Sequence, residues 1–290
     1  MRIGGVLGSR LLQCFPTPRS WQSRLTDSSP SQPGKLEAYW GSEIWEELAG
    51  RTVIDFGCRT GGDAIEMARR GAQRVIGLDI VPNALAVAAR AAERANVADR
   101  CTFRTATEEK ADAIICIDGF EHFADPAAIL RTMATLLKPG GTAFVSFGPP
   151  WLHPYGGHSF SVFPWAHLLF SEHALLRWRS RYCTDGATRF HEVCGGLNQM
   201  TIRRFERLVE ASSLRMMDFK AIPIHSVRLL HNRLTREFFT SMVRCKLTLD
   251  FASSSRGTPN DESGLTFSSG CAIRSASQEE NLCAPRRRLV

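Results

Sequence analysis

Several features that assign sequences to common protein classes are missing from this chain of 290 residues. No apolar run approaches the roughly 18–20 residues that a membrane-spanning helix needs. No C-x-x-C pair occurs among the nine cysteines, and Cys183, His191 and Cys194 lack a fourth ligand at a usual spacing, so we predict no metal site. No segment interleaves basic with aromatic residues, and no N-P-P-Y-like target-base motif is present, which argues against nucleic acid as a partner.

The two ends of the chain hold most of its net charge of +7. Residues 1–33 contain four arginines and one aspartate, and residues 251–290 contain five arginines and four acids. Both segments are rich in polar residues and lack a sustained apolar pattern, so we expect both to be disordered. Arg10 interrupts the apolar N-terminal stretch, and no small-residue cleavage site follows it. We therefore expect a cytoplasmic protein with free thiols.

The segment Thr52–Gly62 organises the rest of the chain. Its first half, Thr52–Phe56, is rich in β-branched and aromatic residues and predicts a buried strand, which glycines follow at positions 57, 61 and 62. Glycine adopts positive φ and lets a ligand approach the backbone closely. A second strand ends at Asp79, whose carboxylate can accept hydrogen bonds from ribose hydroxyls. This pattern predicts a nucleotide-binding site.

These residues resemble the class I S-adenosylmethionine-dependent methyltransferases. Asp55–Gly61 is similar to the first motif of that family, D-x-G-C-G-T-G, except that Arg59 replaces the central glycine. Phe120–Pro126 resembles the E-H-x-x-D-P stretch of ubiquinone-pathway and related methyltransferases, and Leu136–Gly141 resembles the turn before the family's fifth strand. The resemblance covers about residues 35–250, and it is specific for fold and cofactor rather than for substrate.

The resemblance implies S-adenosylmethionine as the cofactor. Backbone N–H groups around Gly57–Gly61 would face the methionine carboxylate, Asp55 would help to hold that end, and Asp79 would bind the ribose. Further contacts would come from the ends of the second, third and fourth strands. The predicted cofactor residues are Asp55, Gly57, Cys58, Gly61, Asp79, Ile80, Ala106, Thr107 and Ile117.

Methyl transfer needs little chemical help from the protein, because the sulfonium is a strong electrophile and alignment supplies most of the acceleration. A poorly acidic acceptor still needs a general base, and histidine suits that role near neutral pH. We predict His122 as that base and Glu121 as the residue that orients it or binds a metal. His158, which follows two glycines, is the second candidate base, and His153 is the third.

Strands and helices alternate with short turns from residue 52 onward, which predicts a doubly wound, parallel α/β sheet. The resemblance adds that this Rossmann-like sheet has seven strands, mostly parallel with an antiparallel last strand, and helices on both faces. The predicted strands are residues 52–56, 74–78, 101–105, 113–117, 142–147, 214–221 and 242–249. The predicted helices are residues 35–49, 61–70, 82–96, 126–137, 201–210 and 227–239.

Residues 148–196 interrupt the alternation with three tryptophans and five histidines. A connection of this length is often functional, so we interpret it as a substrate cap within a methyltransferase domain of residues 34–250. A purely structural insertion is the alternative.

The sequence as a whole predicts an enzyme that transfers a methyl group to a small-molecule or lipid-linked acceptor, with oxygen favoured as the acceptor atom. Two alternatives stay open. Arginine is disfavoured at positive φ, so Arg59 could make the cofactor loop degenerate and the chain a non-catalytic binding module. A Rossmann oxidoreductase is disfavoured because no G-x-G-x-x-G opens the helix at residues 61–70. The sequence predicts neither the acceptor nor the oligomeric state.

Overall fold

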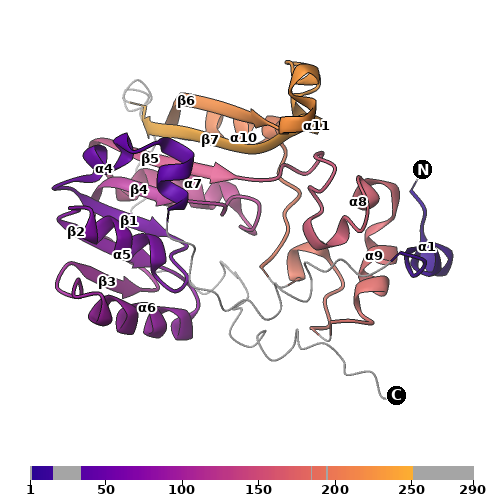
Figure 1. Ribbon diagram of the computed structural model, residues 1–290, viewed down its shortest axis with the longest axis horizontal. Helices are drawn as coiled ribbons and strands as arrows, with labels where there is room; N and C mark the ends of the chain where they lie inside the picture. The colour runs from indigo at the N-terminus through magenta and orange to yellow at the C-terminus, as the bar shows by residue number, and fades with distance from the viewer. Residues whose placement is uncertain (1, 16–33, 184, 194, 251–290) are drawn as a thin grey trace, which may run out of the picture.

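A computed structural model describes residues 2–15, 34–183, 185–193 and 195–250 of the chain (Figure 1). The tail predicted at residues 251–290 lies outside this part, as do residues 16–33. Within the described residues, no helix is long and apolar enough to cross a bilayer.

A seven-stranded sheet forms the centre of the molecule, in the order β3-β2-β1-β4-β5-β7-β6. Strands β1 to β5 pair in parallel, and β7 runs antiparallel to both of its neighbours, β5 and β6. This confirms the doubly wound, mostly parallel sheet with an antiparallel last strand. The strands are β1 Thr52–Phe56, β2 Arg74–Leu78, β3 Cys101–Arg104, β4 Ala111–Cys116, β5 Leu137–Phe147, β6 Leu214–Pro223 and β7 Thr240–Leu249.

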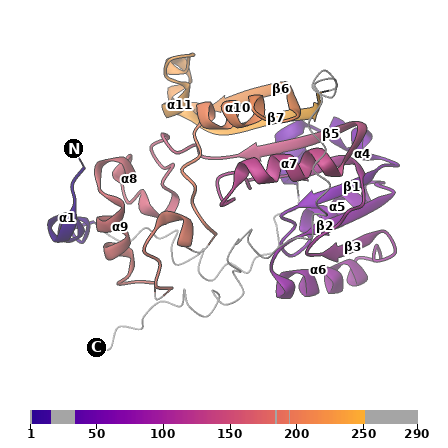
Figure 2. The ribbon, with the colours of Figure 1, turned by 180° about the vertical axis from the view of Figure 1, so that it is seen from behind.

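Each buried strand contributes alternate side chains to two separate cores, because successive residues of a strand point to opposite faces. Val53 and Ile115 pack on one face with helices before and after β1. Ile54 and Ile114 pack on the other face, which α7 and α10 cover (Figure 2). The helices around the sheet are α3 Lys35–Trp40, α4 Glu43–Leu48, α5 Gly62–Arg69, α6 Pro82–Arg94, α7 Pro126–Leu136 and α10 Ile202–Glu210.

Two of the predicted helices are each divided in the structure. The helix predicted at residues 35–49 breaks into α3 and α4 at Gly41, where φ is +81°. The helix predicted at residues 227–239 becomes a 3-10 helix, η3 His225–Leu230, and a short α11 Arg236–Phe239. Between them, Asn232 Oδ1 accepts hydrogen bonds from the amides of Leu234 and Thr235, and such side-chain bonds compete with a continuous helix.

The predicted cap has a hydrophobic core of its own, separate from the two cores of the sheet. Its short elements are η1 His158–Phe160, α8 Ala166–Leu169, α9 Glu172–Arg179 and η2 Phe190–Glu192. The largest fully buried side chains of this core are Phe160, Trp178 and Phe190.

An N-terminal helix, α1 Gly5–Leu12, lies against the cap beside α9 (Figure 1). The prediction of disorder for residues 1–33 is therefore wrong over this helix. The amide of Ile3 donates to Leu169 O at 2.8 Å, and the amide of Ser171 donates to Ile3 O at 2.9 Å. Leu12 is fully buried in the cap core, so burial of an apolar side chain holds this segment where composition alone predicted disorder.

Candidate active site

The loop between β1 and α5 has the left-handed backbone that its glycines predicted. φ is +86° at Gly57 and +80° at Gly61. A Cβ atom added to Gly57 would meet no atom within 4 Å, whereas one added to Gly61 would lie 2.8 Å from the Cβ of Ala88. Gly57 therefore leaves open space for a ligand beside the backbone, and Gly61 permits close helix packing.

Arg59 adopts the conformation that we expected an arginine to disfavour. Its φ is +48°, within the small left-handed region, and its side chain is exposed. Its amide donates to Asp79 Oδ2 at 2.8 Å. The loop thus keeps its shape, with the arginine side chain directed outward.

Three amides of this loop have partners within the protein. Those of Gly57 and Cys58 donate to Leu78 O at 2.8 and 3.0 Å, and that of Gly61 donates to Cys58 O at 2.8 Å. The first two bonds hold the loop against β2, and the third closes the turn within the loop, so these three amides are already paired inside the protein. The Cys58 side chain is also buried, and burial raises the pKa of its thiol.

Asp79 and Asp55 lie at the carboxyl ends of adjacent parallel strands. Asp79 accepts the amides of Arg59 and Val81, one on each oxygen, and each oxygen keeps a second acceptor site for a hydroxyl. Asp55 is 5% exposed, and its Oδ2 has no hydrogen-bond partner. Burial, with Asp63 and Asp79 nearby, raises the pKa of Asp55 well above its usual range. A cationic ligand placed here would relieve both the missing partner and the repulsion.

The other predicted cofactor residues lie at the same edge of the sheet. Ile80 comes just after β2, Ala106 and Thr107 come just after β3, and Ile117 comes just after β4. Because these strands are parallel, their carboxyl ends meet at one edge. None of these four side chains is fully buried.

Asp118 is a polar centre that the sequence analysis missed. Its Oδ2 accepts Lys35 Nζ at 2.9 Å and Tyr39 Oη at 3.2 Å, and its Oδ1 accepts Ser146 Oγ at 3.2 Å. Burial and the Asp118 carboxylate raise the pKa of Tyr39. Helix α3 thus reaches the carboxyl end of β4. The sequence could have indicated Asp118, because it directly follows Ile117, a predicted cofactor residue at the end of the fourth strand.

The loop after β4 brings the three predicted catalytic residues together. His122 Nδ1 lies 3.0 Å from Gly196 O, a carbonyl that can only accept, so Nδ1 carries the proton and Nε2 has the free lone pair. Nε2 lies 4.0 Å from Glu121 Oε1, and the rings of His122 and His158 are 5.5 Å apart.

Glu121 is a carboxyl buried almost completely, at 2% exposed. Its Oε1 accepts the amide of Gly148 at 3.1 Å, and its Oε2 has no hydrogen-bond partner. Burial raises the pKa of Glu121, although His122 and the amide of Gly148 act in the opposite direction. This group is placed to respond to charge on His122.

His153, the third candidate base, is held in a structural role. Its Nδ1 accepts the amide of Tyr155 at 2.9 Å, and burial lowers its pKa to about 4. His167 is similar: Ser161 Oγ and Trp151 O lie 2.8 and 2.7 Å from its two ring nitrogens, and burial lowers its pKa to about 4. Neither ring has a lone pair free for an acceptor proton.

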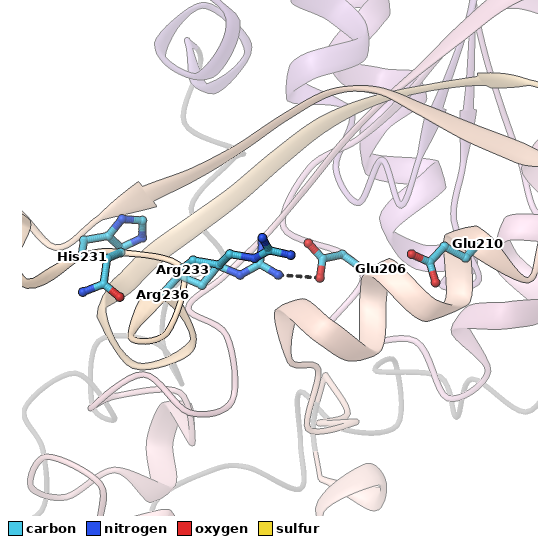
Figure 3. A pocket seen from close by; sticks show the side chains of 6 residues that line it. Glu206, Glu210, His231, Arg233 and Arg236 are labelled. Atoms are coloured by element: carbon cyan, nitrogen blue, oxygen red, sulfur yellow. Dashed lines mark hydrogen bonds and ion pairs between the residues drawn. The ribbon is translucent and has the colours of Figure 1, made fainter.

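Two surface hollows are lined by other residues. A polar hollow of about 580 Å³ separates α10 from the segment before α11 (Figure 3), and its lining is Glu206, Glu210, His231, Asn232, Arg233 and Arg236. A second, of about 320 Å³, lies on the cap between Glu172 and Arg204. No residue predicted to bind cofactor or to act in catalysis lines either one.

The described residues contain no group of three or more histidine, cysteine or acidic side chains placed to hold a metal ion. Cys194, one of the three residues weighed as metal ligands, lies outside the described residues.

Comparison with known proteins places these features in a family. A sequence profile described as a methyltransferase domain matches residues 31–216. The ubiquinone biosynthesis O-methyltransferase of Acinetobacter baumannii (strain AYE) is 37% identical over 134 residues, which are 43% of this chain and 56% of that protein. That of Neisseria meningitidis serogroup C (strain 053442) is 40% identical over 107 residues, 34% of this chain and 45% of that protein. The chain thus spans about half the length of these curated relatives.

Among solved structures, an S-adenosylmethionine-dependent methyltransferase from Mesorhizobium loti aligns with a TM-score of 0.46 and 16% identity, over 69% of this chain and 92% of that one.

The family assignment rests on the extent of the profile match, which covers well over half of the chain and includes both the cofactor loop and the residues after β4. It agrees with the seven-stranded sheet and its antiparallel seventh strand. The prediction made from the four sequence motifs is confirmed: the chain belongs to the methyltransferase domain family, of the class I S-adenosylmethionine-dependent type.

Proposed function

We propose that this protein transfers the methyl group of S-adenosylmethionine to an oxygen atom of a small-molecule or lipid-linked acceptor. The observation that carries the proposal is the pair of acids at the ends of β1 and β2, beside a glycine turn with open space at Gly57. The names of the curated relatives, ubiquinone biosynthesis O-methyltransferases, support oxygen as the acceptor atom.

The residues at the strand ends fit the cofactor. Asp79 retains acceptor sites for two ribose hydroxyls, and Asp55 offers an unpartnered oxygen beside a group of acids that a cation would neutralise. S-adenosylmethionine carries an ammonium and a sulfonium, and it supplies the electrophilic methyl group. Asp55 and Asp79 would hold and orient it. Further contacts with the bound cofactor would come from Ile80, Ala106, Thr107 and Ile117.

His122 would act as the general base. The carbonyl of Gly196 fixes its ring through Nδ1, so Nε2 can take the hydroxyl proton of the acceptor. The resulting imidazolium would lie beside the Glu121 carboxyl, 4.0 Å from Nε2, and that buried carboxyl would stabilise the charge. His158, against the His122 ring, would narrow the space around the acceptor.

The cap would contribute the acceptor side of the site. It supplies the Gly196 carbonyl that fixes His122, and its His158 ring contacts His122 directly. We therefore propose residues 34–250 as the methyltransferase domain, with residues 148–196 as the part that selects the acceptor.

Calorimetric titration with S-adenosylhomocysteine tests the cofactor site. The wild-type chain should bind it, and Asp79→Ala should weaken binding about 100-fold, because a charged acceptor for two hydroxyls is lost. Asp99→Ala, at an exposed acid outside the site, is the matched control and should bind as the wild type does. If a folded wild-type chain fails to bind, the proposal is wrong and the non-catalytic alternative explains the loop.

A further inference from the structure

The connection between β6 and β7, residues 224–239, exposes several large apolar side chains to solvent. We call this segment the leucine loop. Leu229 is 93% exposed and Leu234 is 81% exposed, the two highest values among large apolar residues of the described chain. Leu230 and Phe238 are 56% and 40% exposed. Helix η3 within this segment has no buried residue at all.

The exposed charged side chains that belong to the leucine loop itself are arginines. Arg228 and Arg233 are exposed, and Arg233 also lines the hollow that Glu206 and Glu210 of α10 border. The acid of the loop, Glu237, is 5% exposed and accepts the amides of Ile202 and Arg203 at 3.0 and 2.8 Å, so it caps α10 and does not face outward. Arg236 pairs at 2.7 Å with Glu206 of α10, as Figure 3 shows.

The base of the leucine loop is held firmly, so its leucines are not exposed by a loose chain. The amide of Ile224 donates to Phe239 O at 2.8 Å, and His231 Nε2 lies 2.9 Å from Thr240 Oγ1. The turn at Asn232 and the cap on α10 add further anchors. A pre-formed apolar tip loses little conformational entropy when it enters an apolar medium.

The leucine loop stands at the same edge of the sheet as the candidate active site. β7 runs antiparallel to both β5 and β6, so β6 ends at the edge where β5 ends. The start of β7, directly after the leucine loop, lies against the first residue of the cap, because a Cβ atom on Gly148 would lie 2.7 Å from Ser241 O. Figure 1 shows the loop projecting beyond the ends of β6 and β7.

We propose that the leucine loop docks this protein on an anionic membrane surface. Exposed leucines flanked by arginines match an interface in which apolar side chains enter the acyl boundary and cations meet the phosphates. A protein partner fits less well, because the loop projects outward, carries no tryptophan or tyrosine, and leucine is under-represented at binding hot spots. Docking here would turn the carboxyl edge of the sheet towards the bilayer, and, resting on the proposed function, would favour a lipid-linked acceptor.

Vesicle flotation of the full chain tests the docking without any catalytic step. The wild type should float with vesicles of phosphatidylcholine and phosphatidylglycerol and much less with phosphatidylcholine alone. Leu229→Ser/Leu234→Ser should lower the partition coefficient about 100-fold, since each leucine removed is expected to contribute about tenfold. Arg228→Gln/Arg233→Gln should lower it about 30-fold on the anionic vesicles.

The matched control is Leu7→Ser/Leu11→Ser on α1, where the same side chains are 67% and 42% exposed. This variant should float as the wild type does. Docking by the leucine loop is contradicted if the wild type does not float, if the loop variant still floats, or if only the α1 variant loses binding. It is also contradicted if the wild type ignores vesicles and forms a dimer that the loop variant abolishes.

Titration with S-adenosylhomocysteine separates the two proposals. The loop variants should bind it as the wild type does, because no changed residue belongs to the cofactor site. Failure of the wild type to bind it would contradict the proposed function and leave the flotation result unaffected.

Discussion

Buried polar groups of the cap and of the strand ends are treated in opposite ways. In the cap, Arg179 and Asp185 form two hydrogen bonds of 2.6 Å, and His167 is bonded at both nitrogens. At the strand ends, Asp55 and Glu121 each keep an oxygen with no partner. Unsatisfied buried polar atoms are costly and persist where a ligand completes them. These polar groups of the cap core are satisfied within the chain, whereas Asp55 at the end of β1 and Glu121 in the loop after β4 each keep an oxygen that a ligand would complete.

The sharpest test of this contrast removes a large side chain from the cap core. Phe190 is 1% exposed, with its ring 4.8 Å from that of Phe160 and 5.4 Å from that of Trp151. Phe190→Ala should lower the free energy of unfolding by about 4 kcal/mol, because it leaves a cavity. Chemical denaturation followed by tryptophan fluorescence measures this change.

The loss of stability should not change the affinity of the folded protein for the cofactor. S-adenosylhomocysteine affinity of Phe190→Ala should stay within about twofold of the wild type, since the two cores are separate. Leu169→Ala, at a 49% exposed position of the same cap, is the control and should change stability by less than about 0.5 kcal/mol. A large loss of affinity in Phe190→Ala would show that the cap and the cofactor half are one energetic unit.

The next test compares a histidine at the strand ends with one in the cap. His122→Ala should lower kcat about 100-fold, the usual contribution of a general base. His153→Ala, whose Nδ1 only accepts a local amide, should change kcat less than about threefold. Transfer of radiolabelled methyl groups to a panel of hydroxylated acceptors measures both. Equal losses in the two variants would mean that His122 is structural too.

The same contrast explains how far the sequence could be interpreted. The strands from β1 to β4 were predicted within two residues, because a parallel strand buried on both faces is a short apolar run between turns. β5 begins at Leu137, five residues before the predicted start, and includes the residues predicted as a turn. Asp55 and Asp79 could be assigned because strand ends fix where a side chain lies. The partners of the loop amides could not be predicted, because two of the acceptors, Leu78 O and Asp79, lie in or just after another strand and no local pattern reveals them.

The structure of the cap could not be predicted, because it too depends on residues that are distant in the sequence. Its elements are short, and their order depends on contacts far apart in the sequence, such as the burial of Leu12 among residues of α9 and η2. A histidine in such a segment looks the same whether it is a base or a buried structural group. Only its hydrogen bonds distinguish His122 from His153.

Asp63, in the first turn of α5, tests whether the acids near the strand ends repel one another in the free protein. Burial, which outweighs the attraction of Lys35, raises its pKa to about 6. Because the folded pKa lies above the unfolded one, ionisation of Asp63 costs stability as the pH rises through about 4 to 6. Asp63→Asn should therefore stabilise the free protein at pH 8 by about 1 kcal/mol, after the lost helix-dipole interaction is subtracted, and should be neutral near pH 4.

The measurement is thermal unfolding at both pH values, with and without S-adenosylhomocysteine. The ligand should stabilise the wild type more than Asp63→Asn at pH 8, because its ammonium relieves the same repulsion. Glu93→Gln, on the exposed side of α6, is the control and should show no pH-dependent difference. A gain in Asp63→Asn of equal size at both pH values would contradict the electrostatic account.

The smallest expected effect concerns Arg59, the residue in which this loop departs from the family motif. A left-handed conformation destabilises a non-glycine residue by about 1–2 kcal/mol, and glycine removes this strain. Glycine also loses more conformational entropy on folding, which lowers stability by about 0.5–1 kcal/mol. Arg59→Gly should thus raise the free energy of unfolding by about 0.5 kcal/mol. The amide bond to Asp79 should survive, so S-adenosylhomocysteine affinity should stay within about twofold.

Asn96→Gly supplies the matched control for this change. Asn96 also has a positive φ, +54°, but lies after α6, away from the site. It should gain less stability than Arg59→Gly, because asparagine tolerates the left-handed region better, and its affinity should not change. If Arg59→Gly instead loses about tenfold in affinity while Asn96→Gly does not, the guanidinium itself contacts the cofactor. Arg59, which replaces the glycine of the family motif, would then be a cofactor-binding residue, and it would join Asp55 and Glu121 among the groups that a ligand completes.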